Sequence, residues 1–241
     1  MKQVIAMHGW AGDHRIWAPW ARQFQAQNWH WQSGERGYGH LTPRCPDWLT
    51  NPDDAPHRRV VIGHSLGPHL LGEHHLRQAT DVVFLASFSR FVPEGRAGRA
   101  LHTGLKGMGR SIGSDGEDSM LQTFLARAAA PAAADGLPAS PARDGLSSPG
   151  REQLRGDLTR LIECTSLPAG LPHQARVLVV EAGSDAIVVP EARRQLIDDL
   201  AAHLDQPPEV WTLQDSGHAL LVPDLLLRVQ AWLDDVPFSS P

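Results

Sequence analysis

Cysteine is scarce in this chain of 241 residues: there are two, Cys45 and Cys164, and they lie far apart without the spacing of metal ligands. Such usage is typical of a reducing compartment, although it leaves one disulfide open. No apolar run reaches the ~18 residues that a membrane-spanning helix needs. The first residues lead directly into a strand-like run, without the apolar segment and small-residue cleavage site of a signal peptide. The sequence therefore predicts a cytoplasmic protein.

An excess of charge of one sign is also lacking. The chain has 22 basic and 27 acidic residues, which give a formal net charge of −5. This balance gives no general attraction to nucleic acid or to a membrane surface, so we expect neither as a partner. The length permits one sizeable α/β domain, or a domain with an insertion. Tryptophan is the unusual residue, with eight copies against a single tyrosine.

The most informative stretch spans residues 60–68, where a β-branched run leads into Gly63-His64-Ser65-Leu66-Gly67 and then a helix-like segment. This strand–turn–helix context is typical of a nucleophile elbow. Gly63 and Gly67 lack the bulk that such a tight turn excludes, and glycine tolerates strained backbone angles. The turn would lift the Ser65 hydroxyl off the strand and place the N–H of Leu66 at a helix start, where anions are stabilised. The alternative is a glycine-rich turn with an inert serine.

Apolar runs of strand length alternate with segments of helical periodicity along most of the chain. The predicted strands lie at residues 4–7, 29–32, 59–64, 82–86, 175–181 and 209–213, and the predicted helices at 14–27, 66–77, 190–202 and 223–233. This alternation predicts an α/β fold with a mostly parallel sheet and helices on both faces.

Between residues 88 and 170 the alternation breaks. Helix-like stretches such as 120–128 are separated by loops, and residues 128–150 are rich in Ala, Pro, Gly and Ser. That composition favours a flexible loop or linker over a packed element. We therefore expect a core formed by residues 1–87 and 171–241, with a small cap inserted at 88–170.

A serine nucleophile needs a base, and the base needs an acid that fixes its tautomer. Ligands of parallel sheets gather at the carboxyl ends of the strands, so the residues just after strands are the candidates. Asp185 follows the predicted strand at 175–181, and His218 follows the one at 209–213. Separately, Asp185 fits a helix cap and His218 a loop hydrogen bond, and Asp215 is a rival acid. Together with Ser65, Asp185 and His218 predict a catalytic triad.

The other histidines carry weaker indications. His64 is expected to pack on the opposite face of the turn from the Ser65 hydroxyl. His69, His74 and His75 lie along the predicted helix at 66–77, and no carboxylate or further histidine stands at ligand spacing from them. We therefore expect neither a metal nor a cofactor.

A further motif, His8-Gly9-Trp10, follows the first predicted strand. Together these motifs resemble the α/β-hydrolase superfamily over essentially the whole chain. The order of Ser65, Asp185 and His218 along the chain is also the order of that superfamily. The resemblance implies the α/β-hydrolase fold and an oxyanion hole made by the backbone N–H groups of Trp10 and Leu66. Within the superfamily the chain is similar to the small pimeloyl-[acyl-carrier-protein] methyl ester esterases of biotin synthesis. That similarity lies in the His-Gly-Trp motif, the short chain and Phe124-Leu125-Ala126-Arg127.

This resemblance implies a serine carboxylesterase that hydrolyses pimeloyl-[acyl-carrier-protein] methyl ester through an acyl-enzyme, with Phe124 in the substrate site. A general carboxylesterase or thioesterase for free small molecules is one alternative, and a non-catalytic binding protein of the same fold is another. The first part of the expected cap holds five cations and a single acidic residue, Glu94. The cations are Arg90, Arg96, Arg99, Lys106 and Arg110. They form either a solvated surface or a docking face for an acidic acyl carrier protein.

Overall fold

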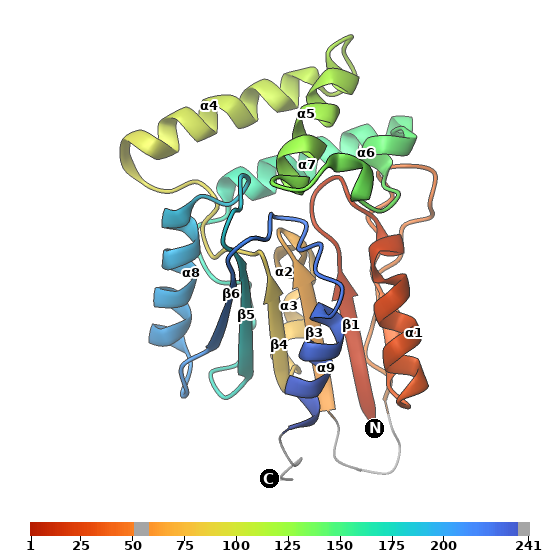
Figure 1. The fold of residues 1–241 in the computed structure, drawn as a ribbon, viewed down its shortest axis with the longest axis vertical. Helices are drawn as coiled ribbons and strands as arrows, with labels where there is room; N and C mark the ends of the chain where they lie inside the picture. Colours follow the sequence, from red (N-terminus) through yellow and green to blue (C-terminus); the bar gives the residue numbers. More distant parts are fainter. Residues whose placement is uncertain (51–57, 236–241) are drawn as a thin grey trace.

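The computed structural model describes residues 1–50 and 58–235. Their centre is a sheet of six strands in the order β2-β1-β3-β4-β5-β6, in which every pair of neighbours is parallel (Figure 1). The strands are β1 (Lys2–Met7), β2 (His30–Ser33), β3 (Arg58–His64), β4 (Asp81–Leu85), β5 (Arg176–Ala182) and β6 (Glu209–Leu213). The predicted strands are thereby confirmed.

Helices cover both faces of the sheet, which confirms the predicted α/β fold (Figure 1). One face carries η1 (His14–Trp17), α1 (Ala18–Ala26) and α9 (Leu225–Asp234), and the other carries α2 (Gly67–Leu70), α3 (Glu73–Arg77) and α8 (Pro190–His203). β3 shows how the strands divide the core: Val60 and Ile62 pack on the first face and Val61 on the second. This is the alternation of a pleated strand.

A further layer lies beyond the carboxyl ends of the strands, at the top of Figure 1. It consists of α4 (Gly95–Ser111), α5 (Glu117–Ala129), η2 (Ala134–Gly136), α6 (Pro141–Asp144) and α7 (Ser148–Glu163). All of these elements fall within residues 88–170, the expected cap. Within residues 1–50 and 58–235, no helix is both long and apolar enough to cross a membrane.

The expectation of an unpacked linker at residues 128–150 is wrong. The segment holds the end of α5, then η2, α6 and the start of α7. Leu137, Ala142 and Leu146 are buried in it, and the N–H of Ser147 donates to the carbonyl of Tyr38. A few apolar side chains are enough to anchor a segment whose composition is otherwise that of a linker.

The helix predicted over residues 66–77 is in fact two short helices. Between α2 and α3, Leu71 and Gly72 adopt extended backbone with ψ near 150°. The break turns His75 inward, where its ring accepts the N–H of Gly72 and donates to the carbonyl of Pro46. These tertiary contacts override a helical pattern that glycine weakens.

Candidate active site

Ser65 occupies a strained turn between β3 and α2. Its φ is +55°, in the left-handed region that is costly for a residue with a side chain. The N–H of Ser65 donates to the carbonyl of Leu85 at 2.8 Å, and the carbonyl of Ser65 accepts the hydroxyl of Ser87 at 2.6 Å. Both bonds tie the turn to the end of β4, so the strain expected of an elbow is present and supported.

The two glycines of the elbow are required by close approach. A Cβ on Gly63 would lie 2.3 Å from the ring of Pro68, and a Cβ on Gly67 would lie 2.2 Å from the carbonyl oxygen of Met7. Neither position has room for a side chain, because the start of α2 packs directly against β1 and the elbow.

His218 and Asp185 form a buried pair. His218 Nδ1 lies 2.9 Å from Asp185 Oδ2, and both side chains are almost fully buried. The second oxygen of Asp185 accepts the N–H groups of Ile187 and Val188 at 2.7 and 2.9 Å. Burial alone would raise the pKa of Asp185, but the imidazole of His218 and these N–H groups hold it below its ordinary value. The rival acid, Asp215, is exposed.

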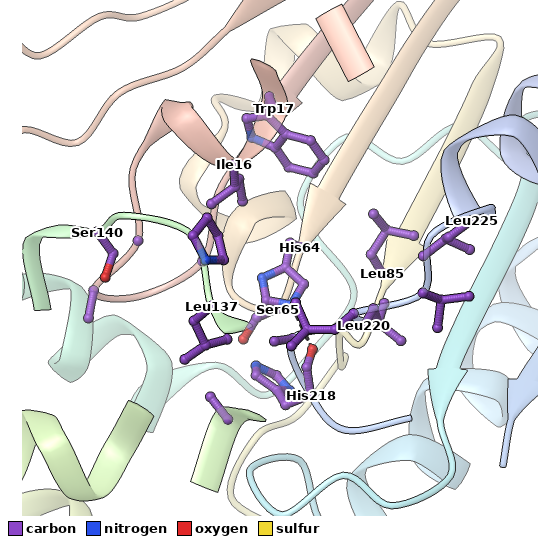
Figure 2. A pocket seen from close by; sticks show the side chains of 18 of the residues that line it. Ile16, Trp17, His64, Ser65, Leu85, Leu137, Ser140, His218, Leu220 and Leu225 are labelled. Atoms are coloured by element: carbon purple, nitrogen blue, oxygen red, sulfur yellow. Dashed lines mark hydrogen bonds between the residues drawn. The ribbon is translucent and has the colours of Figure 1, made fainter. Parts of the chain in front are cut away.

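An ionised Asp185 fixes the tautomer of His218. The carboxylate holds the ring proton on Nδ1, which leaves Nε2 as the nitrogen that can accept a proton. His218 and Ser65 line one cavity of about 420 Å³, and both side chains reach into it (Figure 2). Within the described part of the chain the Ser65 hydroxyl has no hydrogen-bond partner, so it is free to turn toward His218.

The cavity is mainly apolar. Its wall includes Ile16, Trp17, Trp20, Leu85, Phe124, Leu137, Leu220 and Leu225. Phe124 lines this cavity edge-on to Trp10, with ring centroids 5.0 Å apart. Among the described residues that line the cavity there is no Asp, Glu, Lys or Arg. A cavity of this size and character suits a small neutral ligand, because a charge placed in it would lose its hydration.

The turn at Gly9 and Trp10 lies against Ser65. A Cβ on Gly9 would come within 2.9 Å of Ser65 Cβ. In the parts of the chain that the structure describes, the backbone N–H groups of Trp10 and Leu66 have no acceptor. Unpaired N–H groups are uncommon inside proteins. Two of them beside a serine are suited to stabilise a negatively charged oxygen.

His64 is a correction to the sequence analysis, because it lies on the same side as the cavity rather than on the opposite face of the turn (Figure 2). Its Nε2 donates to the carbonyl of His218 at 2.9 Å, and the two rings are 5.0 Å apart. Burial, and then the nearby imidazole, lower the pKa of His64 to about 4, so the ring is neutral at ordinary pH. No pattern in the sequence pairs residue 64 with residue 218.

The cations that form either a docking face or a solvated surface do not line the cavity. Four of them are exposed on α4: Arg96, Arg99, Lys106 and Arg110. Arg90 precedes that helix and is half-buried, 3.1 Å from the carboxylate of Glu94.

His74 and His75 do have a carboxylate nearby, contrary to the expectation from spacing. Asp47 brings an oxygen to them, and one ligand-type atom of each of the three side chains lies within 4.8 Å of the others. His75, however, already uses both ring nitrogens, for the N–H of Gly72 and the carbonyl of Pro46. The group therefore has no free lone pair on its buried histidine.

Neither models of protein families nor curated protein sequences give a match to this chain. Solved structures do. The chain is similar to an esterase from Exiguobacterium antarcticum, with 13% identity, a TM-score of 0.66 and coverage of 98% of this chain and 92% of that one. It is also similar to a bromoperoxidase from Bacillus anthracis, with 14% identity, a TM-score of 0.64 and coverage of 97% and 92%.

A third similar structure is an esterase from a Rhodococcus species, with 14% identity, a TM-score of 0.59 and coverage of 98% and 91%. At these identities the likeness concerns the fold. The parallel sheet, the elbow after β3 and these neighbours show that the chain has the α/β-hydrolase fold.

Proposed function

We propose that this protein is a serine hydrolase that cleaves carboxylic esters with Ser65, His218 and Asp185. The observation that carries the proposal is a buried His218–Asp185 pair that opens onto the same cavity as a serine with positive φ. A structural role explains Asp185 as the anchor of its own loop, but it does not explain why strain is kept at Ser65 beside unpaired N–H groups. The likeness in fold to two esterases agrees with the proposal.

In the first half of the reaction the Ser65 oxygen attacks the ester carbonyl carbon, and its proton passes to His218 Nε2. The carbonyl oxygen becomes negative and is stabilised by the N–H groups of Trp10 and Leu66. Each such donor contributes roughly 3–4 kcal/mol in serine hydrolases. The tetrahedral adduct then expels the alcohol oxygen, which takes the proton from His218, and the acyl group remains on Ser65.

In the second half, water gives a proton to His218 Nε2 and its oxygen attacks the acyl-enzyme. The adduct collapses as Ser65 recovers its proton from His218, and the carboxylic acid leaves. Asp185 stabilises the imidazolium in both halves without taking a proton itself.

The test is Ser65→Ala. We expect it to abolish hydrolysis of a short p-nitrophenyl ester and labelling by a fluorophosphonate, with the melting temperature unchanged. Ser89→Ala is the matched control, because Ser89 is a buried serine that follows β4 and lies outside the cavity. Full activity of the Ser65 variant would end the proposal. Failure of the wild-type protein to react with the fluorophosphonate would favour a non-catalytic binding protein instead.

For the substrate we propose a neutral ester with an apolar acyl chain, and pimeloyl-[acyl-carrier-protein] methyl ester as the particular ester. The apolar lining supports the class, because the methyl ester end of this substrate carries no charge. The exposed cations of α4 support the carrier, since an acidic carrier protein would be attracted to them.

A growth experiment tests whether this particular ester is the substrate. The gene is introduced into a biotin-requiring strain that lacks its methyl ester esterase. We expect the wild-type gene to restore growth and the Ser65→Ala gene not to. If growth is not restored while the purified protein hydrolyses free esters or thioesters, a general carboxylesterase or thioesterase is the better description.

A further inference from the structure

Behind the turn at residues 8–10 lies an ion pair, between a buried aspartate and a half-buried arginine, that does not touch the cavity. Asp157, on α7, is 2% exposed. The guanidinium of Arg36 donates to both of its oxygens, at 2.8 and 2.6 Å, and the hydroxyl of Tyr38 donates to it at 2.6 Å. Three donors from the loop after β2 therefore converge on one carboxylate of α7.

The backbone of Arg36 continues this connection to His8. The N–H of Arg36 donates to His8 Nε2 at 3.2 Å. Because Nε2 accepts, the ring proton is on Nδ1, which donates to the carbonyl of Gly9 at 2.8 Å. His8 is fully buried, and burial lowers its pKa, so the ring stays neutral and keeps both bonds.

A second connection reaches the same turn from the same helix. The indole N–H of Trp10 donates to the carbonyl of Leu154 at 2.9 Å, about one helical turn before Asp157. α7 thus holds the Trp10 side chain directly, and it holds the carbonyl of Gly9 through Arg36 and His8. The peptide between Gly9 and Trp10 carries the N–H that is proposed above as an oxyanion donor.

We propose that Asp157 is a positioning residue for the oxyanion hole. Through Arg36 and His8 it fixes the Gly9–Trp10 peptide, so that the N–H of Trp10 meets the oxygen whose charge develops during attack by Ser65. The inference rests on the proposed esterase function. A buried ion pair contributes little to stability when compared with apolar packing, so its continuation into the turn by hydrogen bonds indicates a geometric role.

The test compares Asp157→Asn with Glu117→Gln. Glu117 is also buried, and it binds a different α7 residue, Arg151, through two N–H groups at 2.7 and 2.6 Å. The control therefore breaks an α7 ion pair of the same kind that has no link to His8. Four quantities are measured: kcat and KM for a p-nitrophenyl ester, and the affinities for an alkylboronic acid, which forms a tetrahedral adduct on Ser65, and for an ether analogue of the ester.

For Asp157→Asn we expect kcat and boronic acid affinity to fall together by about ten-fold, because a displaced donor loses part of its transition-state stabilisation. KM and the affinity for the ether are expected to stay within about two-fold of wild type. Glu117→Gln is expected to leave all four quantities unchanged. Equal losses in both variants, or a change confined to KM, would overturn the inference.

Arg36→Lys gives a second test if Asp157→Asn does not fold. Lysine keeps the charge but lacks the planar fork that binds both carboxylate oxygens, so the same split between kcat and KM is expected. A wild-type protein that neither hydrolyses the ester nor binds the boronic acid would refute the proposed function. An active wild-type protein with unchanged kinetics in both Asp157→Asn and Arg36→Lys would refute only the role of Asp157.

Discussion

The backbone conformation of Ser65 costs roughly 1–3 kcal/mol, and its neighbours compensate for that cost. Leu85 and Ser87 bind its N–H and its carbonyl, so the turn cannot relax by rotating either peptide. The Cβ of Ser65 is therefore held in place. Gly9 packs so close to it that a methyl group on Gly9 would have no room. The geometry around Ser65 therefore depends on the absence of a side chain at Gly9 as much as on the side chains that are present.

Gly9→Ala should therefore lower activity. The added methyl would lie 2.9 Å from Ser65 Cβ, and since Ser65 is fixed, the turn that carries the Trp10 N–H must retreat. We expect kcat for a p-nitrophenyl ester to fall by about ten-fold or more. Gly12→Ala is the control, because its nearest contact would be an ordinary 3.4 Å. Equal kinetics for the two variants would contradict this account of the turn.

Asp185→Asn should separate the two roles of that residue. The Asn oxygen still accepts the N–H groups of Ile187 and Val188, so the loop is expected to hold its shape. The Asn amide then donates to His218 Nδ1, so the ring proton of His218 moves to Nε2. A protonated Nε2 can no longer accept the proton of Ser65. Steady-state kinetics should show kcat lower by about 10⁴ with the melting temperature little changed. A loss of less than about ten-fold would mean that another group orients His218.

At the scale of elements, the helices beyond the strand ends build the site as well as cover it. The end of α5 holds the loop that carries His218, since the carbonyl of Ala128 accepts the N–H of Ala219 and Gly217 packs against the carbonyl of Ala130. On the other side of the cavity α7 holds the turn at residues 8–10. The loop that carries His218 and the turn that carries Trp10 are therefore each braced by a helix from the segment 88–170.

His69, on α2, predicts how the stability of the folded protein depends on pH. His69 donates from Nε2 to the carbonyl of Phe88 at 2.8 Å, and burial lowers its pKa to about 4. Below pH 6.5 the unfolded chain takes up a proton on this ring while the folded protein does not, so stability falls as the pH is lowered from about 6.5 to about 4. This residue alone accounts for up to about 3 kcal/mol of that fall.

His69→Gln keeps a donor but does not titrate, so chemical denaturation should show a smaller loss of stability between pH 6.5 and pH 4 than in wild type. His30→Gln, which replaces an exposed histidine on β2, is the control. If wild type and the His69 variant lose the same stability between pH 6.5 and pH 4, the His69 ring of the wild type takes up its proton in the folded protein as it does in the unfolded chain.

At the scale of the whole molecule, sheet order decides which residues can meet. Ser65 follows β3 at the centre of the sheet, whereas Asp185 and His218 follow β5 and β6 at one edge. The loop after β6 must return across the strand ends to bring His218 to Ser65 (Figure 1). The cavity lies where these loops converge, and the cations of α4 lie outside it.

Reversal of charge on α4 tests whether this outer surface docks a carrier protein. Arg96→Glu and Arg99→Glu should each raise KM for a carrier-bound ester by about three- to ten-fold at low salt and leave KM for a free ester unchanged. Added salt should shrink the difference, because exposed charges are screened. Arg22→Glu, an exposed cation on α1, controls for net charge. Equal effects on the two substrates would argue against docking.

The strands, and the positions of Ser65, Asp185 and His218 just after three of them, were predictable because both depend on local pattern. Buried parallel strands are continuous apolar runs, and the residues just after them lie at one edge of the sheet wherever the strands fall in order. The packing of residues 128–150, the break between α2 and α3, and the direction of His64 were not predictable. Each depends on contacts between residues distant in the chain, such as that of Ser147 with Tyr38 or of His64 with His218. The Asp157–Arg36 pair was missed for the same reason.

The hydrogen bond from His64 to the carbonyl of His218 joins the residue next to Ser65 to the backbone of His218. A single side chain, that of His64, therefore fixes the distance between the backbone at His218 and the turn at Ser65. Insertions or deletions between β6 and α9 should be tolerated to the extent that they preserve this span. Redesign of that loop for a new substrate has to begin by keeping position 64 in reach of position 218.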